Sequence, residues 1–331
     1  MRLFVCETIT GGGLRGQALP PALLRDGEAM FQALYRQLQS LPGLQLITTR
    51  DARLPALPGA IPVNPGTDLT ELWRRCLEEA DAAWVIAPES GGELLRLRRL
   101  ADAAGCDFIG CDAHSIELTG SKLATARYFS RRGFTCIETV TLSEPLPRSD
   151  AGWVVKPDDG AGCEQTWYFR SVEMLRAWRR EHADTQRFVL QPRVAGVAAS
   201  LSVLYGAGGS ELLSCNIQEI EFRDNRVQAG GLRVGALNGR RQALAGFAAA
   251  VGTALPGLRG YVGIDFMDTP QGPVLVEINP RLTTAYAGLA GILDDNPAAR
   301  ILGALGALPE PEAADCLSNG SATEYTGEHR G

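Results

Sequence analysis

Residues 261–281, YVGIDFMDTPQGPVLVEINPR, contain two β-rich runs that flank the turn signal TPQG. In a hairpin symmetric about Gln271, Asp265 lies opposite Glu277, and Asn279 lies two residues farther along on the same face. Opposed carboxylates repel each other, so this face needs a compensating cation. Carboxylate and amide oxygens are ligands that Mg²⁺ prefers, so Asp265, Glu277 and Asn279 are candidate metal ligands. The alternative is a solvent-facing strand pair whose charges are hydrated.

The chain has only two lysines, Lys122 and Lys156, among its 32 basic residues. A compact ammonium fits phosphate oxygens in a narrow pocket where a planar guanidinium does not. Lys156 is followed by the glycine-containing loop DDGAGCEQT, whose backbone N–H groups could fold over phosphates. The alternative is a plain hairpin turn, because Asp-Gly is a common turn pair. The candidate phosphate-binding residues of this loop are Asp158, Gly160, Gly162 and Cys163.

Composition narrows the class of protein. The chain has 331 residues, 45% of them apolar, which is enough for two or three compact units. A net charge of −6 without a basic patch argues against a nucleic-acid partner, and no apolar run approaches the ~18 residues of a membrane helix. The N-terminus reads as a first strand, not a signal peptide. Eight scattered cysteines without C-x-x-C pairs predict free thiols in a reducing cytoplasm.

The order of segments predicts a mixed α/β and α+β architecture. Residues 1–112 alternate strand-like and helix-like segments, including a helix over 28–41, and this alternation predicts a parallel sheet flanked by helices. A second unit over 113–195 contains the two lysines and a predicted strand over 135–140. The pattern over 196–308 becomes antiparallel. The composition of 309–331 predicts a mobile tail.

Taken in order, these motifs resemble those of the ATP-grasp ligases. The resemblance rests on SK at 121–122, VVKP at 154–157, the glycine loop, QPRVAG at 191–196, YVGIDF at 261–266 and EINPR at 277–281. It covers about 115–285, with the expected preceding domain in front. It implies an ATP-grasp fold, in which ATP lies between a small lid subdomain and an antiparallel C-terminal domain.

The resemblance also implies roles for individual residues. Lys122 and Lys156 would contact the phosphates of ATP, and Arg281 would stabilise the transferring phosphoryl group. Gln191 and Val194 would line the adenine pocket. The three metal-ligand candidates would hold two Mg²⁺ ions, with Mn²⁺ as an alternative.

One position departs from the family pattern. Many members carry a glutamate just after the glycine of this segment to hold the ribose hydroxyls, whereas this chain has Ala198. How the ribose is held is therefore open, and an ordinary D-alanine–D-alanine ligase is less expected.

Two shorter stretches resemble the tyramine–glutamate ligases of methanofuran biosynthesis. They are Glu7 with DGEAM at 26–30, and INPRLTTAY at 278–286. This resemblance implies ATP-driven amide formation through an acyl phosphate, joining L-glutamate to tyramine or tyrosine in a methanofuran-like one-carbon cofactor pathway. A homodimer is expected by analogy only. The substrate-binding candidates are Glu7, Gly11, Gly12, Gly13, Arg233, Thr283 and Thr284.

Four other interpretations are open. The chain could be an ATP-grasp ligase with different substrates or a regulatory nucleotide-binding relative that has lost catalysis, although its intact motifs disfavour the latter. GGGLRG at 11–16 formally fits a dinucleotide fingerprint, but QALPP follows where a helix should open. Cys163 as a nucleophile lacks a histidine nearby in the sequence.

Overall fold

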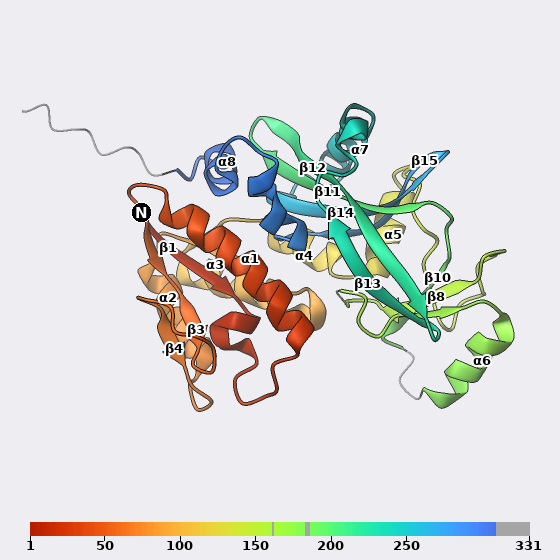
Figure 1. Ribbon diagram of the computed structural model, residues 1–331, viewed down its shortest axis with the longest axis horizontal. Coiled ribbons are helices and arrows are strands. Elements are labelled where there is room, and N and C mark those ends of the chain that lie inside the picture. Colours follow the sequence, from red (N-terminus) through yellow and green to blue (C-terminus); the bar gives the residue numbers. More distant parts are fainter. Residues whose placement is uncertain (161, 183–185, 309–331) are drawn as a thin grey trace, which may run out of the picture.

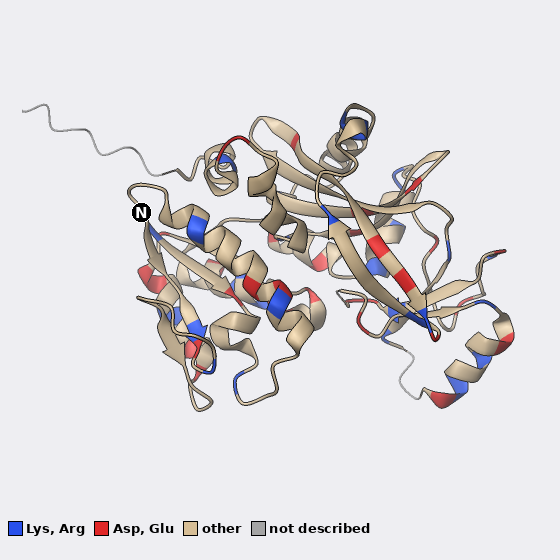
Figure 2. Ribbon diagram, in the orientation of Figure 1, with Lys and Arg blue, Asp and Glu red and all other residues tan. Residues whose placement is uncertain are grey.

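The computed structural model describes residues 1–160, 162–182 and 186–308 (Figure 1). The predicted mobile tail, 309–331, lies outside the described residues. Figure 2 shows acidic and basic residues mixed over both halves of the molecule.

The N-terminal part contains the predicted parallel sheet, with strand order β2-β1-β5-β6. The strands of this sheet alternate with helices along the chain, as predicted. Its elements are β1 (Arg2–Glu7), α1 (Pro21–Gln39), β2 (Gln45–Ile47), α2 (Leu69–Glu79), β5 (Ala82–Ile86), α3 (Glu93–Ala104) and β6 (Asp107–Phe108). Two short turns, η1 (Ile9–Gly13) and η2 (Ser90–Gly92), follow β1 and β5, and β3 (Thr49–Asp51) pairs with β4 (Ile61–Val63).

Helix α1 joins the N-terminal sheet to the C-terminal part of the chain. It begins at Pro21, before the predicted start, because proline fits the first helical position, where no intrahelical N–H bond is needed. Its buried residues, such as Leu34, share one core with the β1 strand and with Tyr286 and Ile301 from the C-terminal segments η4 (Thr284–Gly291) and α8 (Pro297–Ala304). Figure 1 shows α1 between the N-terminal sheet and the C-terminal segments η4 and α8.

A small unit follows, with its own core of aromatic residues. It comprises β7 (Val140–Thr141), β8 (Trp153–Pro157), β9 (Trp167–Phe169), α6 (Val172–Glu181) and β10 (Phe188–Pro192). The preceding helices α4 (Ala113–Thr119) and α5 (Lys122–Ser130) pack through Ile116 and Phe129 into the large core of the molecule. Trp167 and Trp178 pack with ring centroids 5.0 Å apart. The strand predicted over 135–140 is wrong for most of that range: only β7 and an isolated bridge from Cys136 to Leu275 are present.

The remaining five strands join the four strands of the small unit in one nine-stranded sheet, in the order β15-β14-β11-β12-β13-β9-β8-β10-β7. They are the antiparallel β11 (Val197–Gly206), β12 (Gly209–Arg223), β13 (Arg226–Arg233), β14 (Gly260–Thr269) and β15 (Gly272–Asn279), with η3 (Asn238–Arg240) and α7 (Arg241–Ala254) preceding β14. A single pair, Arg226 with Trp167, connects β13 to β9. The small unit and the large antiparallel part are thus hydrogen-bonded at this narrow junction and, separately, by the backbone bonds of Thr135 and Ile137 with Leu275.

The β14–β15 hairpin reaches the predicted register by an unpredicted route. The tight turn pairs Thr269 with Gly272, and this register alone would place Asp265 opposite Val276. A β-bulge shifts the pairing between Asp265 and Phe266, which leaves Val276 as the extra residue. Asp265 therefore pairs with Glu277, as predicted, but the hairpin is not symmetric about Gln271.

Candidate functional site

The two lysines and the hairpin carboxylates lie together. Lys122 Nζ is 3.3 Å from Glu277 Oε2, and Lys156 Nζ is 3.7 Å from the same oxygen. Glu277 faces Asp265 across the hairpin, and Asn279 Nδ2 donates a hydrogen bond to Asp265 Oδ2 at 3.4 Å. Lys122 and Asp265, which are 143 positions apart in the sequence, thus lie in one polar cluster.

The sequence did not point to Gln218, which also contacts this cluster. Its side-chain amide donates to Asp265 Oδ1 at 3.2 Å from β12, which is separated from β14 by β11. Gln218 is one of several polar residues on β12, so no local pattern singled it out.

The pKa values of Asp265 and Glu277 shift in opposite directions. Burial, and then the charge of Glu277, raise the pKa of Asp265 to about 7. Burial would also raise the pKa of Glu277, but Lys122 and Lys156 outweigh it and lower that pKa to about 2. Burial lowers the pKa of Lys156, and the attraction of Glu277 opposes that shift. The cluster therefore holds one firmly ionised carboxylate and one that titrates near neutrality.

The donor set fits a divalent cation that also binds phosphate. Within the described ranges, no group of three or more His, Cys, Asp and Glu side chains is arranged to hold a metal. The cluster instead offers two carboxylates and the amide of Asn279. Mg²⁺ is commonly bound by one or two carboxylates, with phosphate oxygens and water completing its shell.

Ionising Asp265 is expected to destabilise the metal-free protein. The folded-state pKa of about 7 lies above the ordinary value of 3.8, so the folded state keeps a proton that the unfolded state has lost. Relative to Asp265→Asn, the wild type should lose stability as pH rises from about 4 to about 7 and then level off. Urea unfolding of both proteins in EDTA across this range checks the expectation. A difference that does not change with pH would contradict it.

Asp158 fixes the glycine loop to helix α5. Its carboxylate accepts hydrogen bonds from Ser121 Oγ at 2.6 Å and from the backbone N–H of Leu123 at 2.8 Å. The Asp158 carbonyl also accepts a bond from the backbone N–H of Lys122 at 3.0 Å. Asp158 thus holds the lysine-bearing helix end against the loop, and its predicted contact with ATP stays a prediction.

The rest of the glycine loop lies close to the cluster. Lys122 Nζ donates to the carbonyl of Gly160, and Gly162 has the left-handed φ of 65°. Cys163 shares this conformation, with a φ of 60°. Burial raises the pKa of its thiol, and Lys156 offsets this only in part, so the thiol stays protonated at neutral pH. A nucleophilic role for Cys163 is therefore disfavoured.

Arg281 forms a buried ion pair that the sequence did not reveal. Its Nη2 and Nε donate to Glu89 Oε2 at 2.8 and 3.2 Å, and the two side chains are only 11% and 8% exposed. Glu89 comes from the N-terminal part, 192 positions earlier. The following residues reach the glycine loop, because Ser90 Oγ and the Gly91 N–H both donate to Asp159 at 2.9 Å. The segment after β5 therefore contacts both Arg281, which follows the hairpin, and the glycine loop.

The predicted adenine-binding segment lies where β10 leads into β11. Gln191 is buried, and its side-chain amide donates to Thr139 Oγ1 at 2.9 Å. Val194 is half-buried in the connection, and Ala198 lies on β11. The roles of Gln191 and Val194 in binding adenine stay predictions.

Glu7 and the glycines after it form a packed turn. Both Glu7 oxygens accept backbone N–H bonds, from Ile9 at 3.0 Å and Thr10 at 2.8 Å. Gly11 and Gly12 are buried, and a Cβ on Gly12 would lie 2.5 Å from Val63. Gly13 is less buried and lines a cavity. The structure therefore gives Glu7, Gly11 and Gly12 a packing role, and their predicted contact with substrate stays a prediction.

Gly27 explains part of the DGEAM pattern, and replacing it should be costly. A Cβ on Gly27 would lie 2.7 Å from Glu7 Oε2, a carboxylate that its two backbone donors hold in place. Gly27→Ala should destabilise the protein by about 1–3 kcal/mol, because the carboxylate must leave its donors. The matched control is Gly246→Ala in α7, where a Cβ meets nothing within 4 Å and about 0.5–1 kcal/mol of stabilisation is expected. Urea unfolding measures both, and equal stabilisation would refute the contact.

The remaining substrate candidates are dispersed. Arg233 is mostly exposed and pairs with Glu219 at 3.1 Å. It faces the opposite side of the sheet from Gln218, because Gln218 pairs across the strands with Leu232. Thr283 Oγ1 shares a hydrogen bond of 2.8 Å with Tyr261, whereas Thr284 is exposed. Their contacts with substrate stay predictions.

Two protein-family models and two named proteins match the sequence of this chain. A pre-ATP-grasp domain family matches residues 44–116, and an ATP-grasp domain family matches 119–285. The tyramine–L-glutamate ligases of Methanocaldococcus jannaschii and Methanocaldococcus fervens are each 27% identical over 212 residues, or 64% of this chain. The matches span 59% and 62% of those two proteins. Among the described residues, no helix has the length and apolar character needed to cross a bilayer.

Solved structures share the fold. An ATP-grasp superfamily protein from Archaeoglobus fulgidus has a TM-score of 0.71 at 22% identity, covering 92% of this chain and 89% of that one. D-alanine–D-alanine ligase from Bacillus anthracis has a TM-score of 0.63 at 13% identity, covering 92% and 97%. The fold class expected from the sequence is therefore confirmed. Because the ATP-grasp domain match spans half of the chain, this protein belongs to the ATP-grasp family.

Proposed function

We propose that this protein is an ATP-dependent carboxylate–amine ligase. The observation that carries the proposal is the convergence of Lys122 and Lys156 on Glu277, opposite Asp265, in a largely buried cluster. Two ammonium groups and two carboxylates in a confined space suit a phosphate chain bound with a divalent cation. Family membership supports the same chemistry.

Each group in the cluster has a proposed task. Asp265, Glu277 and Asn279 would hold the cation, which would neutralise charge on the phosphate oxygens when bound. Lys122 and Lys156 would then turn from Glu277 to the phosphates of ATP. Arg281 would stabilise the transferring phosphoryl group, and the glycine loop would keep water away from it.

The proposed reaction has two steps. An oxygen of the acid substrate attacks the γ-phosphorus of ATP, which forms an acyl phosphate and releases ADP. The nitrogen of the amine then attacks the acyl carbon, and the carbon–oxygen bond to phosphate breaks. The amine loses a proton, and the products are the amide and inorganic phosphate. The protein contributes position and charge compensation to both steps.

The substrates we propose are L-glutamate and an aromatic amine, either tyrosine or tyramine. The names of the two Methanocaldococcus relatives support this choice, as do the N-terminal pattern and the segment after Asn279. A methanofuran-like one-carbon cofactor pathway and a cytoplasmic location belong to the same proposal. A homodimer remains an expectation by analogy.

Release of ADP with Mg·ATP tests the proposal. L-glutamate is offered with tyrosine, tyramine and other amines, and mass spectrometry identifies the product. ADP should appear only with a matching pair, together with an α- or γ-glutamyl amide. ADP with a different pair would keep the ligase and discard these substrates. Tight ATP binding without ADP release for any pair would favour a regulatory protein.

Two variants support the test. Asp265→Asn should abolish ADP release, because it removes a proposed cation ligand. Glu221→Gln, on β12 of the same sheet, changes an exposed carboxylate by the same chemistry and should leave the rate unchanged.

A further inference from the structure

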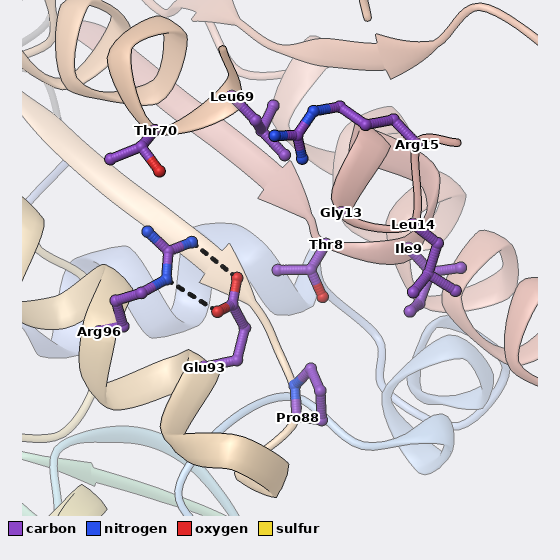
Figure 3. Close-up of a pocket in the computed structure, with 10 residues that line it drawn as sticks. All are labelled: Thr8, Ile9, Gly13, Leu14, Arg15, Leu69, Thr70, Pro88, Glu93 and Arg96. Carbon is purple, nitrogen blue, oxygen red and sulfur yellow. Dashed lines mark hydrogen bonds and ion pairs between the residues drawn. The ribbon is translucent and has the colours of Figure 1, made fainter. Parts of the chain in front are cut away.

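A cavity of about 320 Å³ lies at the carboxyl ends of β1 and β5, outside the lysine–carboxylate cluster. Its volume is at the lower end of the range for small-molecule sites. Thr8 and Gly13 line it from the turn after β1, and Pro88 lines it from the segment after β5 (Figure 3). Glu89, the partner of Arg281, directly follows Pro88. The cavity is therefore next to the proposed reaction site along the chain.

The charges in this cavity leave one guanidinium uncompensated. Arg96 is neutralised by Glu93, which accepts two hydrogen bonds from it at 2.8 Å (Figure 3). Arg15 uses its Nε to donate to the carbonyl of Thr67 at 2.7 Å. Neither Nη group of Arg15 has a hydrogen-bond partner within the ranges that the structure describes. The lining thus carries one net positive charge.

Two helix N-termini lie at the cavity, where Asp68 caps α2 and where Glu71 and Glu93 each place a carboxylate in a first turn. Leu69 and Thr70 belong to the first turn of α2, and Glu93 opens α3. The first turn of a helix presents unpaired N–H groups and the positive end of its dipole.

A buried hydroxyl also lacks a partner. Thr8 is 3% exposed and lines the cavity, and its Oγ1 has no hydrogen-bond partner among the described residues. Buried hydroxyl groups are normally satisfied, so an unmet one at a cavity indicates a missing polar ligand. Oγ1 can donate to an anion.

The rest of the cavity lining is largely apolar and includes Ile9, Leu14, Leu69 and Pro88. A ligand that matches this mixed lining combines an anionic group with an apolar body. L-glutamate, with two carboxylates and a short stem, matches the apolar residues poorly.

We infer that this cavity binds the carboxylate of the amine substrate, so that this substrate is an amino acid with an apolar or aromatic side chain and not a decarboxylated amine. The inference rests on the proposed ligase function. It assigns Arg15 and Thr8 to substrate recognition, which neither the motifs nor the matched families indicate. It also separates the two amines that the proposed function leaves open.

Calorimetric titration without ATP tests the site directly. The probes are L-tyrosine, tyramine, L-glutamate and inorganic phosphate. L-tyrosine should bind at least about tenfold more tightly than tyramine, because a hydrogen-bonded charge is worth roughly that much. Equal affinities for the two would overturn the inference, as would binding of glutamate or phosphate in place of tyrosine.

Two variants locate the binding. Thr8→Val keeps the shape and removes a hydroxyl that makes no internal bond, so thermal stability should hold. It should weaken tyrosine binding severalfold, and Arg15→Gln should weaken it about tenfold or more, while tyramine binding changes little. Arg75→Gln, at an exposed position on α2, is the control and should change neither. If neither Thr8→Val nor Arg15→Gln changes the affinity for tyrosine, tyrosine binds elsewhere and the proposed site is refuted.

The two proposals fail in different ways. If tyrosine binds through Arg15 but no ADP is released with any acid, the cavity is right and the ligase is wrong. If ADP is released with glutamate and an amine whose KM does not respond to Arg15→Gln or Thr8→Val, the ligase is right and the cavity is wrong.

Discussion

Replacing Lys156 by arginine is expected to slow ADP release about a hundredfold or more, although the charge is unchanged. Lys156 is only 14% exposed and lies 3.7 Å from Glu277, so the site around it is narrow. A guanidinium is broader and planar, and it would move Glu277 or lie away from the phosphates. Misplacement by about 1 Å can cost a hundredfold in rate. Steady-state kinetics with the substrate pair found in the screen measure the effect.

The reverse exchange on α5 provides the control. Arg127 pairs with Glu144 at 2.6 Å on the exposed side, so Arg127→Lys should leave the rate nearly unchanged. An undiminished rate for Lys156→Arg would show that charge alone suffices there. The scarcity of lysine elsewhere would then say nothing about this position.

Removing Arg281 is expected to give the largest loss of stability. Glu89 and Arg281 are both about nine-tenths buried, and they join the N-terminal part to the segment after β15. Arg281→Met would leave the Glu89 charge buried without its partner, at a cost of about 3–5 kcal/mol. It should also abolish ADP release, given the proposed role of Arg281. Denaturant unfolding gives the first value, and kinetics give the second.

A double-mutant cycle separates the two effects. Glu89→Gln combined with Arg281→Met removes both charges, so it should be more stable than Arg281→Met alone while remaining inactive. If the double variant is as unstable as the sum of the single variants, the pair contributes no coupling, and the loss comes from packing.

The sequence predicted the parts of the site that depend on local pattern. Strand alternation placed Glu277 and Asn279 on one face, and residue scarcity marked Lys122 and Lys156. The pairing of Glu277 with Asp265 was also predicted, but it depends on a bulge that the sequence did not show. The alternation of strands and helices also predicted the parallel N-terminal sheet. These signals are short in range or rest on composition, so one sequence is enough to show them.

Other parts depended on contacts that no local pattern encodes. Glu89 meets Arg281 across 192 positions, and only the unusual pair Gly91 and Gly92, both with positive φ, marked its segment as a tight turn. The triple glycine looked like a substrate loop because glycine signals either close approach or internal packing. For Gly12, the contact with Val63 shows internal packing.

The bulge at Val276 has a consequence for anyone comparing or redesigning such proteins. The bulge absorbs one residue of β15, so Glu277 pairs with Asp265 although the turn register alone would place Val276 there. Deleting Val276 would remove the bulge and leave Glu277 opposite Asp265. Inserting one more residue before Glu277 without a second bulge would instead turn Glu277 and Asn279 to the other face of the sheet. Two lengths of this strand therefore give the same pairing, so a one-residue gap at Val276 in an alignment does not separate Glu277 from Asp265.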